Sequence, residues 1–309
     1  MLLFEGIFPV LALALAGYIT ARSGFLSINE YQALARFTFN LVIPCLLFIN
    51  MAHAEIPENF GADFLLAFYV PVLLVYCLTL VTTRFFLKAT GTLQSVLALG
   101  ATYSNTTIVG IPLVLQTLGE QALLPLFLII ATQNLVLFTV ATLFAEREQF
   151  DLSTLLASIA RLLRQLVASP LTASLIAGLA FNLIGLPIYR PLDSALQLMS
   201  EAAIPCALFV LGTSLHQYRV GQQLKPAMLI TALKLIALPL IMATSMLVVF
   251  DVTPLWAKTA ILAASMPAGL SAYVFSVRYQ TGQATIAAAS VISTLLSLIQ
   301  MTLVLMIVP

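Results

Sequence analysis

Residues 97–119 read LALGATYSNTTIVGIPLVLQTLG, an apolar stretch long enough to cross a bilayer as a helix but polar at its centre. The polar run consists of Tyr103, Ser104, Asn105, Thr106 and Thr107, and Gly110 and Pro112 follow it. Proline removes a backbone donor and glycine adds backbone freedom, so both weaken a helix. Because such backbone is tolerated at membrane depth only inside protein or along a cavity, the stretch predicts a broken transmembrane helix.

The composition of the whole chain also indicates a membrane protein. Of the 309 residues, 61% are hydrophobic and only 8% are charged, and the mean hydropathy is +1.07. A soluble fold, which is nearer a quarter charged, could not cover so much apolar surface. The net charge of +1 predicts no nucleic-acid partner. Cys45, Cys77 and Cys206 lie in apolar runs and form neither a disulfide framework nor a metal-ligand pattern.

Ten apolar stretches approach the roughly 20 residues that a helix needs to span the hydrocarbon core. They are residues 4–21, 33–52, 64–86, 93–117, 121–145, 169–186, 192–215, 226–249, 255–279 and 284–308. Ser27 and Glu30 have the spacing of a capping box just before the second stretch. The predicted fold is therefore an all-α polytopic membrane protein with ten transmembrane helices and a lipid bilayer as its surroundings.

The basic residues predict the orientation of these helices, since cytoplasmic loops carry an excess of lysine and arginine. Those in the odd-numbered connections are Arg22, Arg84, Lys88, Arg147, Arg161, Arg164, Arg219, Lys225 and Arg278. The even-numbered connections carry only Arg190 and Lys258. We therefore expect the odd connections to face the cytoplasm and both termini to lie outside.

Residues 146–168 differ from the apolar stretches on either side of them. Polar residues recur there at intervals of three and four, and leucine and isoleucine fill the opposite face. This pattern predicts an amphipathic helix that lies on the cytoplasmic surface. We expect it to link two halves of the chain, residues 1–145 and 169–309.

An internal repeat relates these two halves. At an offset of 161 residues, IPCLLF at 43–48 matches IPCALF at 204–209. The same offset pairs Pro9 with Pro170, Gly17 with Gly178, and Gly24 with Gly185. Each half would hold five helices, and because five is odd the second repeat would be inverted. Inverted repeats recur in secondary transporters, because pseudo-symmetry supplies two conformations of similar energy. A duplicated helix bundle without transport activity is the alternative.

The second half carries a broken helix of its own. Residues 261–282 read ILAASMPAGLSAYVFSVRYQTG, with Pro267 and Gly269 near the middle, and Pro267 corresponds to Asn105 within one residue of the repeat offset. Paired interruptions are the best sequence indication of a transporter's binding site, although two ordinary proline kinks are the alternative. Half-helix N-termini would offer free N–H groups to an anionic substrate. The predicted substrate-binding residues are Tyr103, Ser104, Asn105, Thr106, Pro112, Pro267 and Gly269.

Further polar residues fall within predicted transmembrane helices, where charges are costly and usually mark function or an ion pair. Glu201 and Lys234 could pair, and Glu201 could carry a coupling proton; an interfacial Glu201 and a snorkelling Lys234 are the alternatives. Asn40 is the repeat mate of Glu201. Thr132, Gln133 and Asn134 could line a cavity or hydrogen-bond between helices.

Several motifs resemble the auxin efflux carrier family over essentially the whole chain. Asn105 with Gly110-Ile111-Pro112-Leu113 resembles the signature N-x-x-x-x-G-I-P-L, and Leu233-Lys234-Leu235 with Pro239 resembles the family's eighth helix. The resemblance implies an architecture like that of bile-acid symporters, with a scaffold domain, a transport domain and crossing fourth and ninth helices. It places Asn105, Pro112 and Pro267 at the substrate site, and it implies a homodimer, as is usual in plant members.

The plant carriers often have a long hydrophilic central loop, whereas the linker here is short. The resemblance therefore implies a bacterial member in the inner membrane, with both termini periplasmic. It also implies carboxylates such as malonate or malate as substrates rather than auxin.

These observations together predict a transporter of a small organic anion, secondary active or facilitative, that works by alternating access with an elevator-like movement. The alternative is a sodium-coupled symporter of the bile-acid type, in which Thr132, Gln133 and Asn134 help to coordinate the ion. Whether a proton or sodium couples transport is left open. An enzyme is not expected, because there is no HExxH motif and because His53 and His216 fall in predicted loops. No catalytic residue, cofactor or metal is predicted.

Overall fold

The computed structural model describes residues 2–54, 62–145, 164, 169–185, 187–217 and 223–308. Within these ranges the chain forms helices and no strand, apart from one isolated β-bridge. The predicted amphipathic linker at 146–168 lies outside the described residues except for Arg164. The all-helical fold class is confirmed for the described part of the chain.

Six described helices are long and apolar enough to cross a membrane. They are Ile28–Ala52, Asp63–Leu87, Glu120–Ala145, Arg190–Thr213, Leu224–Val249 and Gln283–Ile307. Thr106–Leu118 and Pro170–Ile184 are shorter apolar helices. The protein is therefore a polytopic membrane protein, while the count of ten helices and the inverted repeat stay predictions.

The chain divides into two compact units. Unit 1 contains Met1–Phe60, Thr107–Ala131 and Leu163–Gln217, and unit 2 contains Gly61–Thr106, Thr132–Leu162 and Tyr218–Pro309. Each unit takes segments from both halves of the sequence, so the compact units do not follow the halves 1–145 and 169–309. One boundary, between Thr106 and Thr107, falls inside the interrupted fourth apolar stretch.

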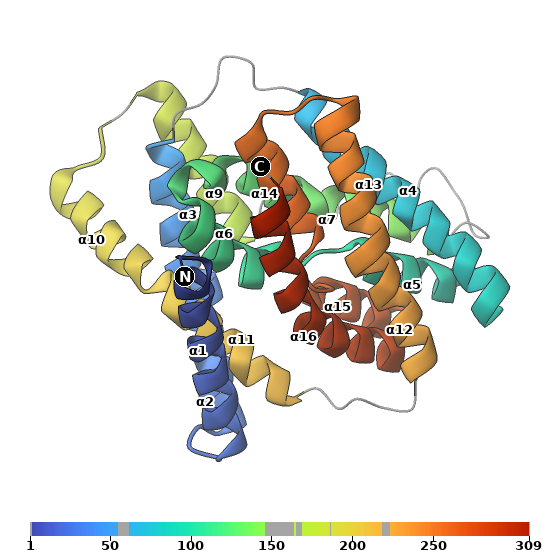
Figure 1. Ribbon diagram of the computed structural model, residues 1–309. Coiled ribbons are helices and arrows are strands. Elements are labelled where there is room, and N and C mark those ends of the chain that lie inside the picture. Colours follow the sequence, from blue (N-terminus) through green and yellow to red (C-terminus); the bar gives the residue numbers. More distant parts are fainter. Residues whose placement is uncertain are drawn as a thin grey trace. The chain divides into compact units, whose positions relative to one another are not determined.

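Unit 1 is built from pairs of helices that come from different halves of the chain. Its elements are α1 (Leu2–Arg22), α2 (Ile28–Phe37), η1 (Thr38–Val42), α3 (Ile43–Ala52), α6 (Ile111–Leu118), η3 (Glu120–Ala122), α9 (Pro170–Ile184), α10 (Arg190–Glu201) and α11 (Ala203–Gln217). Helix α1 packs along α11, and α3 packs along α9 (Figure 1). The expected capping box is confirmed at the start of α2, where the Glu30 carboxylate accepts from the Ser27 N–H over 2.7 Å.

Two glycines allow these helix pairs to approach closely. A Cβ atom at Gly178 in α9 would lie 2.5 Å from the Phe48 carbonyl oxygen and 2.9 Å from the Cβ of Met51, both in α3. A Cβ atom at Gly17 in α1 would collide with the Phe209 carbonyl oxygen in α11. Only glycine fits at such contacts, since even a methyl group would force the helices apart.

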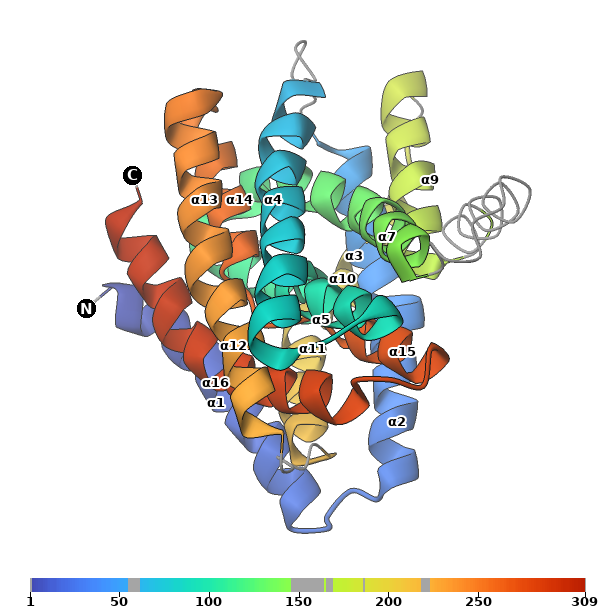
Figure 2. The same cartoon turned by 90° about the vertical axis from the view of Figure 1, so that its right-hand side faces the viewer.

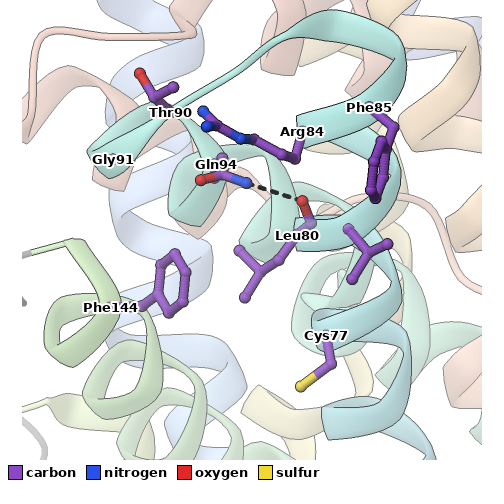
Figure 3. A pocket seen from close by; sticks show the side chains of 9 residues that line it. Cys77, Leu80, Arg84, Phe85, Thr90, Gly91, Gln94 and Phe144 are labelled. Carbon is purple, nitrogen blue, oxygen red and sulfur yellow. Dashed lines mark hydrogen bonds between the residues drawn. The ribbon is translucent and has the colours of Figure 1, made fainter.

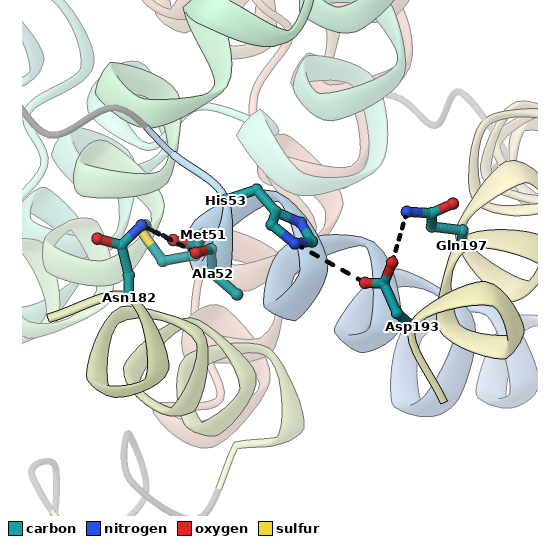
Figure 4. A network of polar contacts seen from close by, with 6 residues as sticks. All are labelled: Met51, Ala52, His53, Asn182, Asp193 and Gln197. Atoms are coloured by element: carbon teal, nitrogen blue, oxygen red, sulfur yellow. Dashed lines mark hydrogen bonds and ion pairs between the residues drawn. The ribbon is translucent and has the colours of Figure 1, made fainter. Parts of the chain in front are cut away.

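A polar network holds the C-terminal end of α3 (Figure 4). The Asn182 side-chain amide donates to the carbonyl oxygens of Met51, Ala52 and Ala54 over 3.2, 2.9 and 2.8 Å, where the helix leaves its last carbonyls unsatisfied. Next to it, His53 Nε2 lies 3.8 Å from Asp193 Oδ1.

Unit 2 holds α5, which is the first part of one interrupted helix, and both parts of the other, α14 and α15. Its elements are α4 (Ala62–Leu87), α5 (Gly91–Thr102), α12 (Leu224–Ala232), η5 (Leu233–Ala237), α13 (Leu238–Thr244), η6 (Ser245–Val249), α14 (Pro254–Ala264), α15 (Leu270–Arg278), α16 (Gln283–Ile307) and the part of α7 (Leu123–Ala145) that follows Ala131. Helix α4 packs against α5 and α13, and α12 packs against α16 (Figure 2).

Candidate functional site

Both predicted helix interruptions are present. Helix α5 ends at Thr102, Tyr103 is extended with φ −77° and ψ 116°, and the chain becomes helical again in η2 (Thr106–Gly110), a π-helix. Helix α14 ends at Ala264, and α15 begins at Leu270. Tyr103, Ser104 and Asn105 of the polar run, and the Pro267–Gly269 segment, therefore lie in non-helical backbone within apolar stretches of the chain, whereas Thr106 and Thr107 begin η2.

The two interruptions are hydrogen-bonded to each other. The Asn105 N–H donates to the Pro267 carbonyl oxygen over 3.0 Å, and the Gly269 N–H donates to the Tyr103 carbonyl oxygen over 2.9 Å. These bonds flank an antiparallel bridge between Ser104 and Ala268. Backbone groups freed by the interruptions thus satisfy one another, as is required in an apolar environment. We call residues 103–105 and 267–269 the crossover bridge.

Glycine is needed at position 269 of the crossover bridge. A Cβ atom there would lie 2.5 Å from Cδ1 of Tyr103 and 3.2 Å from the Ser104 carbonyl oxygen. The conformation of Gly269, with φ −77° and ψ 150°, is open to any residue. The close approach of Tyr103, rather than backbone strain, therefore explains this glycine.

Lys234 places a buried amine against the crossover bridge. Its side chain is fully buried, and Nζ donates to Ser104 Oγ and to the Ala264 carbonyl oxygen, each over 2.7 Å. Ala264 is the last residue of α14, where carbonyls lack helical partners and the helix dipole favours a cation. Among the described residues Lys234 has no carboxylate partner. It lies in the π-helix η5, a type of helix often found at functional sites.

Three consecutive polar residues of α7 make hydrogen bonds to other parts of unit 2, and two of them hold the first interruption in place. Gln133 Nε2 donates to the Ser104 carbonyl oxygen over 2.9 Å, and the Asn134 Oδ1 accepts from the Tyr103 hydroxyl. The Thr132 hydroxyl shares a hydrogen bond of 2.7 Å with the Tyr69 hydroxyl of α4. Of the two roles that the sequence leaves open, these contacts favour hydrogen bonding between helices.

Two features of the site had no counterpart in the sequence prediction. Ser293 of α16 accepts the Ala268 N–H over 3.0 Å, so it supports the second interruption. Ser290, Ser293 and Ser297 are buried on one face of α16. Their spacing of three and four residues is the sequence pattern that could have pointed to Ser293. The Tyr103 ring stacks on Phe138 at 5.8 Å between centroids, and Phe138 stacks on Phe275 at 5.7 Å.

The candidate residues divide between the two units. Tyr103, Ser104, Asn105, Thr106, Pro267 and Gly269 lie in unit 2 with Lys234, Thr132, Gln133 and Asn134. Asn105 is half-buried, and the other five bridge-region residues are buried. Pro112 is buried in α6, in unit 1.

The remaining candidates are surface residues of unit 1. Asn40 is exposed in the π-helix η1, and Glu201 is exposed at the end of α10. Neither Glu201 nor Lys234 has an ion-pair partner in the described part of the chain, where the one ion pair joins His53 to Asp193. His216 lies in the last turn of α11, so its assignment to a loop was wrong. The described residues contain no cluster of ligand side chains suited to a metal ion.

Comparison with known proteins identifies the family of this chain. A family model described as "Membrane transport protein" matches residues 2–305. The chain belongs to this family, the auxin efflux carriers. The resemblance seen in the motifs is therefore confirmed, and the protein is an integral multi-pass membrane transporter of a small molecule.

Two relatives of this carrier cover nearly its whole length. A protein of Rhizobium meliloti named "Putative malonate transporter" is 27% identical over 296 residues, which are 96% of this chain and 92% of the relative. A protein of Methanothermobacter thermautotrophicus named "Uncharacterized transporter" is 27% identical over 305 residues, 97% of this chain and 96% of the relative.

Proposed function

We propose that this carrier moves a small carboxylate, such as malonate or malate, across a bacterial inner membrane by alternating access. The observation that carries the proposal is the crossover bridge, where two helix interruptions meet beside a buried lysine without a carboxylate partner in the described residues. The name of the Rhizobium relative supports malonate as the first substrate to test. The protein acts as a carrier and performs no chemical step on its substrate.

The chemistry of the bridge suits a carboxylate. A buried anion needs a cation and hydrogen-bond donors, since an unpaired charge is costly in an apolar environment. Lys234 supplies the cation in its ammonium form, and the Asn105 amide and the Thr106 hydroxyl supply donors. The N-terminal end of α15, which begins next to Gly269, adds positive partial charge.

The division of the chain into two compact units supports an elevator-like movement of the substrate site. In this proposal unit 1 is the scaffold and unit 2 is the transport domain, which carries the crossover bridge in an elevator-like displacement. Because the boundary between the units falls at Thr106 and Thr107, the chain changes unit right beside the bridge.

The proposal includes ten helices in two inverted repeats of five, with both termini periplasmic. One pattern of contacts supports the repeat: Gly17 meets Phe209, and Gly178 meets Phe48. At the repeat offset of 161 residues, Gly17 corresponds to Gly178 and Phe48 corresponds to Phe209. In each contact, therefore, the glycine of one half of the chain packs against the equivalent phenylalanine of the other half.

A sodium-coupled symporter is the competing proposal. It needs oxygen ligands from Thr132, Gln133 and Asn134, yet the Asn134 oxygen already accepts from the Tyr103 hydroxyl. The ammonium of Lys234 beside Ser104 would also repel a cation. These contacts favour a carboxylate carrier that does not require sodium, with Glu201 as the candidate for proton coupling.

Uptake of labelled malonate into proteoliposomes tests the proposal. We expect uptake that is saturable, that malate inhibits by competition, and that persists without sodium. In Asn105→Ala we expect uptake to fall about tenfold, the size expected for the loss of one hydrogen bond to a charged group. A pH gradient, applied with wild type and Glu201→Gln, tests proton coupling separately. Uptake that requires sodium would favour the symporter, and no uptake of any carboxylate would contradict the proposal.

A further inference from the structure

A pocket of about 780 Å³ lies in unit 2 between the end of α4, the start of α5 and the end of α7 (Figure 3). None of its lining residues belongs to the crossover bridge or contacts Lys234. It is therefore a second site, separate from the one to which the transport activity is assigned.

One end of this pocket is polar and positively charged. Arg84 extends from α4 toward Thr90 and Gly91 at the start of α5, with Gln94 beside it (Figure 3). Arg84 has no ion-pair partner among the described residues. The side chain of Thr90, the N-cap of α5, makes no capping hydrogen bond, which leaves the N–H groups of the first turn available to an anion.

Gln94 adds a hydrogen-bond acceptor to the same end. Its side chain is only 6% exposed, and Nε2 donates to the Leu80 carbonyl oxygen over 2.8 Å. Its Oε1 has no hydrogen-bond partner in the described part of the chain. A ligand that fills this end should therefore carry an anionic group for Arg84 and a hydrogen-bond donor for Gln94.

The other end of the pocket is continuous with an apolar stripe along α4. Its residues follow one another at helical spacing and are 39% to 76% exposed: Leu66, Val70, Leu74, Leu78, Val81 and Phe85. Val81 and Phe85 also line the pocket. The stripe therefore leads along the membrane-spanning part of α4 to the charged end of the pocket.

We propose that this pocket binds an anionic phospholipid of the phosphatidylglycerol type. The phosphate binds Arg84 and the first turn of α5, a hydroxyl of the headgroup glycerol donates to Gln94 Oε1, and an acyl chain lies along the α4 stripe. A free phosphate or a small carboxylate would leave the stripe unused. Phosphatidylethanolamine would bring its ammonium group next to Arg84, which costs electrostatic energy.

The test is lipid binding to the full-length protein in a neutral detergent, measured by native mass spectrometry with phosphatidylglycerol, phosphatidylethanolamine and inorganic phosphate. We expect phosphatidylglycerol to bind roughly tenfold more tightly than phosphatidylethanolamine, and Arg84→Gln to lose about tenfold of that affinity. Arg36→Gln, which removes an exposed arginine of α2 in unit 1, should bind like wild type.

A second variant keeps the test valid if Arg84→Gln does not fold. Phe85→Gln should weaken the binding of long-chain phosphatidylglycerol and leave that of a short-chain analogue unchanged. Equal affinity for both headgroups, or equal loss in Arg84→Gln and Arg36→Gln, would overturn the proposal. Competition by inorganic phosphate or malonate at matched concentration would also overturn it, because the pocket would then be a site for free anions.

Discussion

Asn105 and Pro267 are joined by a backbone hydrogen bond of 3.0 Å, although they lie in the interrupted helices of opposite halves of the chain. The bond fixes the register of the two interruptions, and it places Ser104, with its contact to Lys234, opposite Ala268. Pro267 has no backbone N–H, so it takes part in this backbone pairing only through its carbonyl oxygen, which accepts from the Asn105 N–H. This register brings Ser104 of the polar run, its contact with Lys234 and the second interruption together.

Replacing Lys234 by methionine should weaken malonate binding and leave the fold in place. Methionine keeps much of the volume but removes the ammonium, and the loss of a charged hydrogen bond of about 2 kcal/mol corresponds to roughly 30-fold in affinity. Isothermal titration of malonate measures the change. Lys225→Gln, an exposed lysine of α12, is the matched control. Equal affinity in wild type and Lys234→Met would remove Lys234 from the site.

Replacing Gln133 by leucine should destabilise unit 2. The change leaves the Ser104 carbonyl oxygen without its 2.9 Å hydrogen bond, at a cost of about 1–3 kcal/mol. Thr139→Val on the same helix is the control, because the Thr139 hydroxyl is buried without a hydrogen-bond partner and its removal should cost nothing. Denaturant unfolding in mixed micelles compares the two variants. A larger loss in Thr139→Val would contradict the assigned role of Gln133.

Replacing Gly17 or Gly178 by leucine should lower the unfolding temperature, since each side chain would enter the backbone of the neighbouring helix. Overpacking of this kind typically costs about 1–3 kcal/mol. Ala16→Leu and Ala177→Leu, at exposed positions one residue earlier, should change little. The pseudo-symmetric account requires similar losses in both glycine variants, and a loss in only one of them would argue against it.

Replacing Asn182 by leucine should loosen the end of α3. Three carbonyl oxygens lose their shared donor, and we expect a loss of about 2 kcal/mol in the free energy of unfolding. Asn50→Leu is the comparison, because among the described residues the Asn50 amide bonds only within its own helix, to the Leu46 carbonyl oxygen. Equal effects of the two substitutions would show that the cap contributes nothing.

The sequence predicted those features of the fold that depend on local chemistry. Pro267 and Gly269 indicated the interruption after α14, the polar run indicated the one after α5, and the spacing of Ser27 and Glu30 indicated the start of α2. Gly110 and Pro112 do not break the chain, because it stays helical from η2 into α6. The motif around Asn105 and Pro112 indicated the family. In each case the residues that form the sequence pattern lie close together in the chain, and the structural feature that they predict lies at the same residues.

The tertiary partners of the site residues were beyond the reach of sequence reasoning. The sequence left open whether Lys234 pairs with Glu201 or snorkels, whereas its amine donates to the Ser104 hydroxyl and to the Ala264 carbonyl oxygen at the end of α14. Neither acceptor bears a formal charge, so the charged residues of the sequence do not point to it. Ser293 was missed because a serine on a helix face resembles many others until its neighbour is known. The resemblance implied two domains, but the segments that make up each unit were not predicted, because helices far apart in the chain, such as α1 and α11, pack together in one unit.

The central claim is that the crossover bridge binds a small carboxylate, and thermal unfolding of the purified protein with malonate, malate, lactate or indole-3-acetate tests it most directly. A ligand that binds the folded state raises the unfolding temperature, and the rise grows with the ratio of the free ligand concentration to its Kd. We predict that malonate or malate at a fixed concentration stabilises wild type and Lys225→Gln more than it stabilises Asn105→Ala or Lys234→Met. The central claim would be contradicted if no carboxylate stabilised wild type while sodium or a neutral solute did.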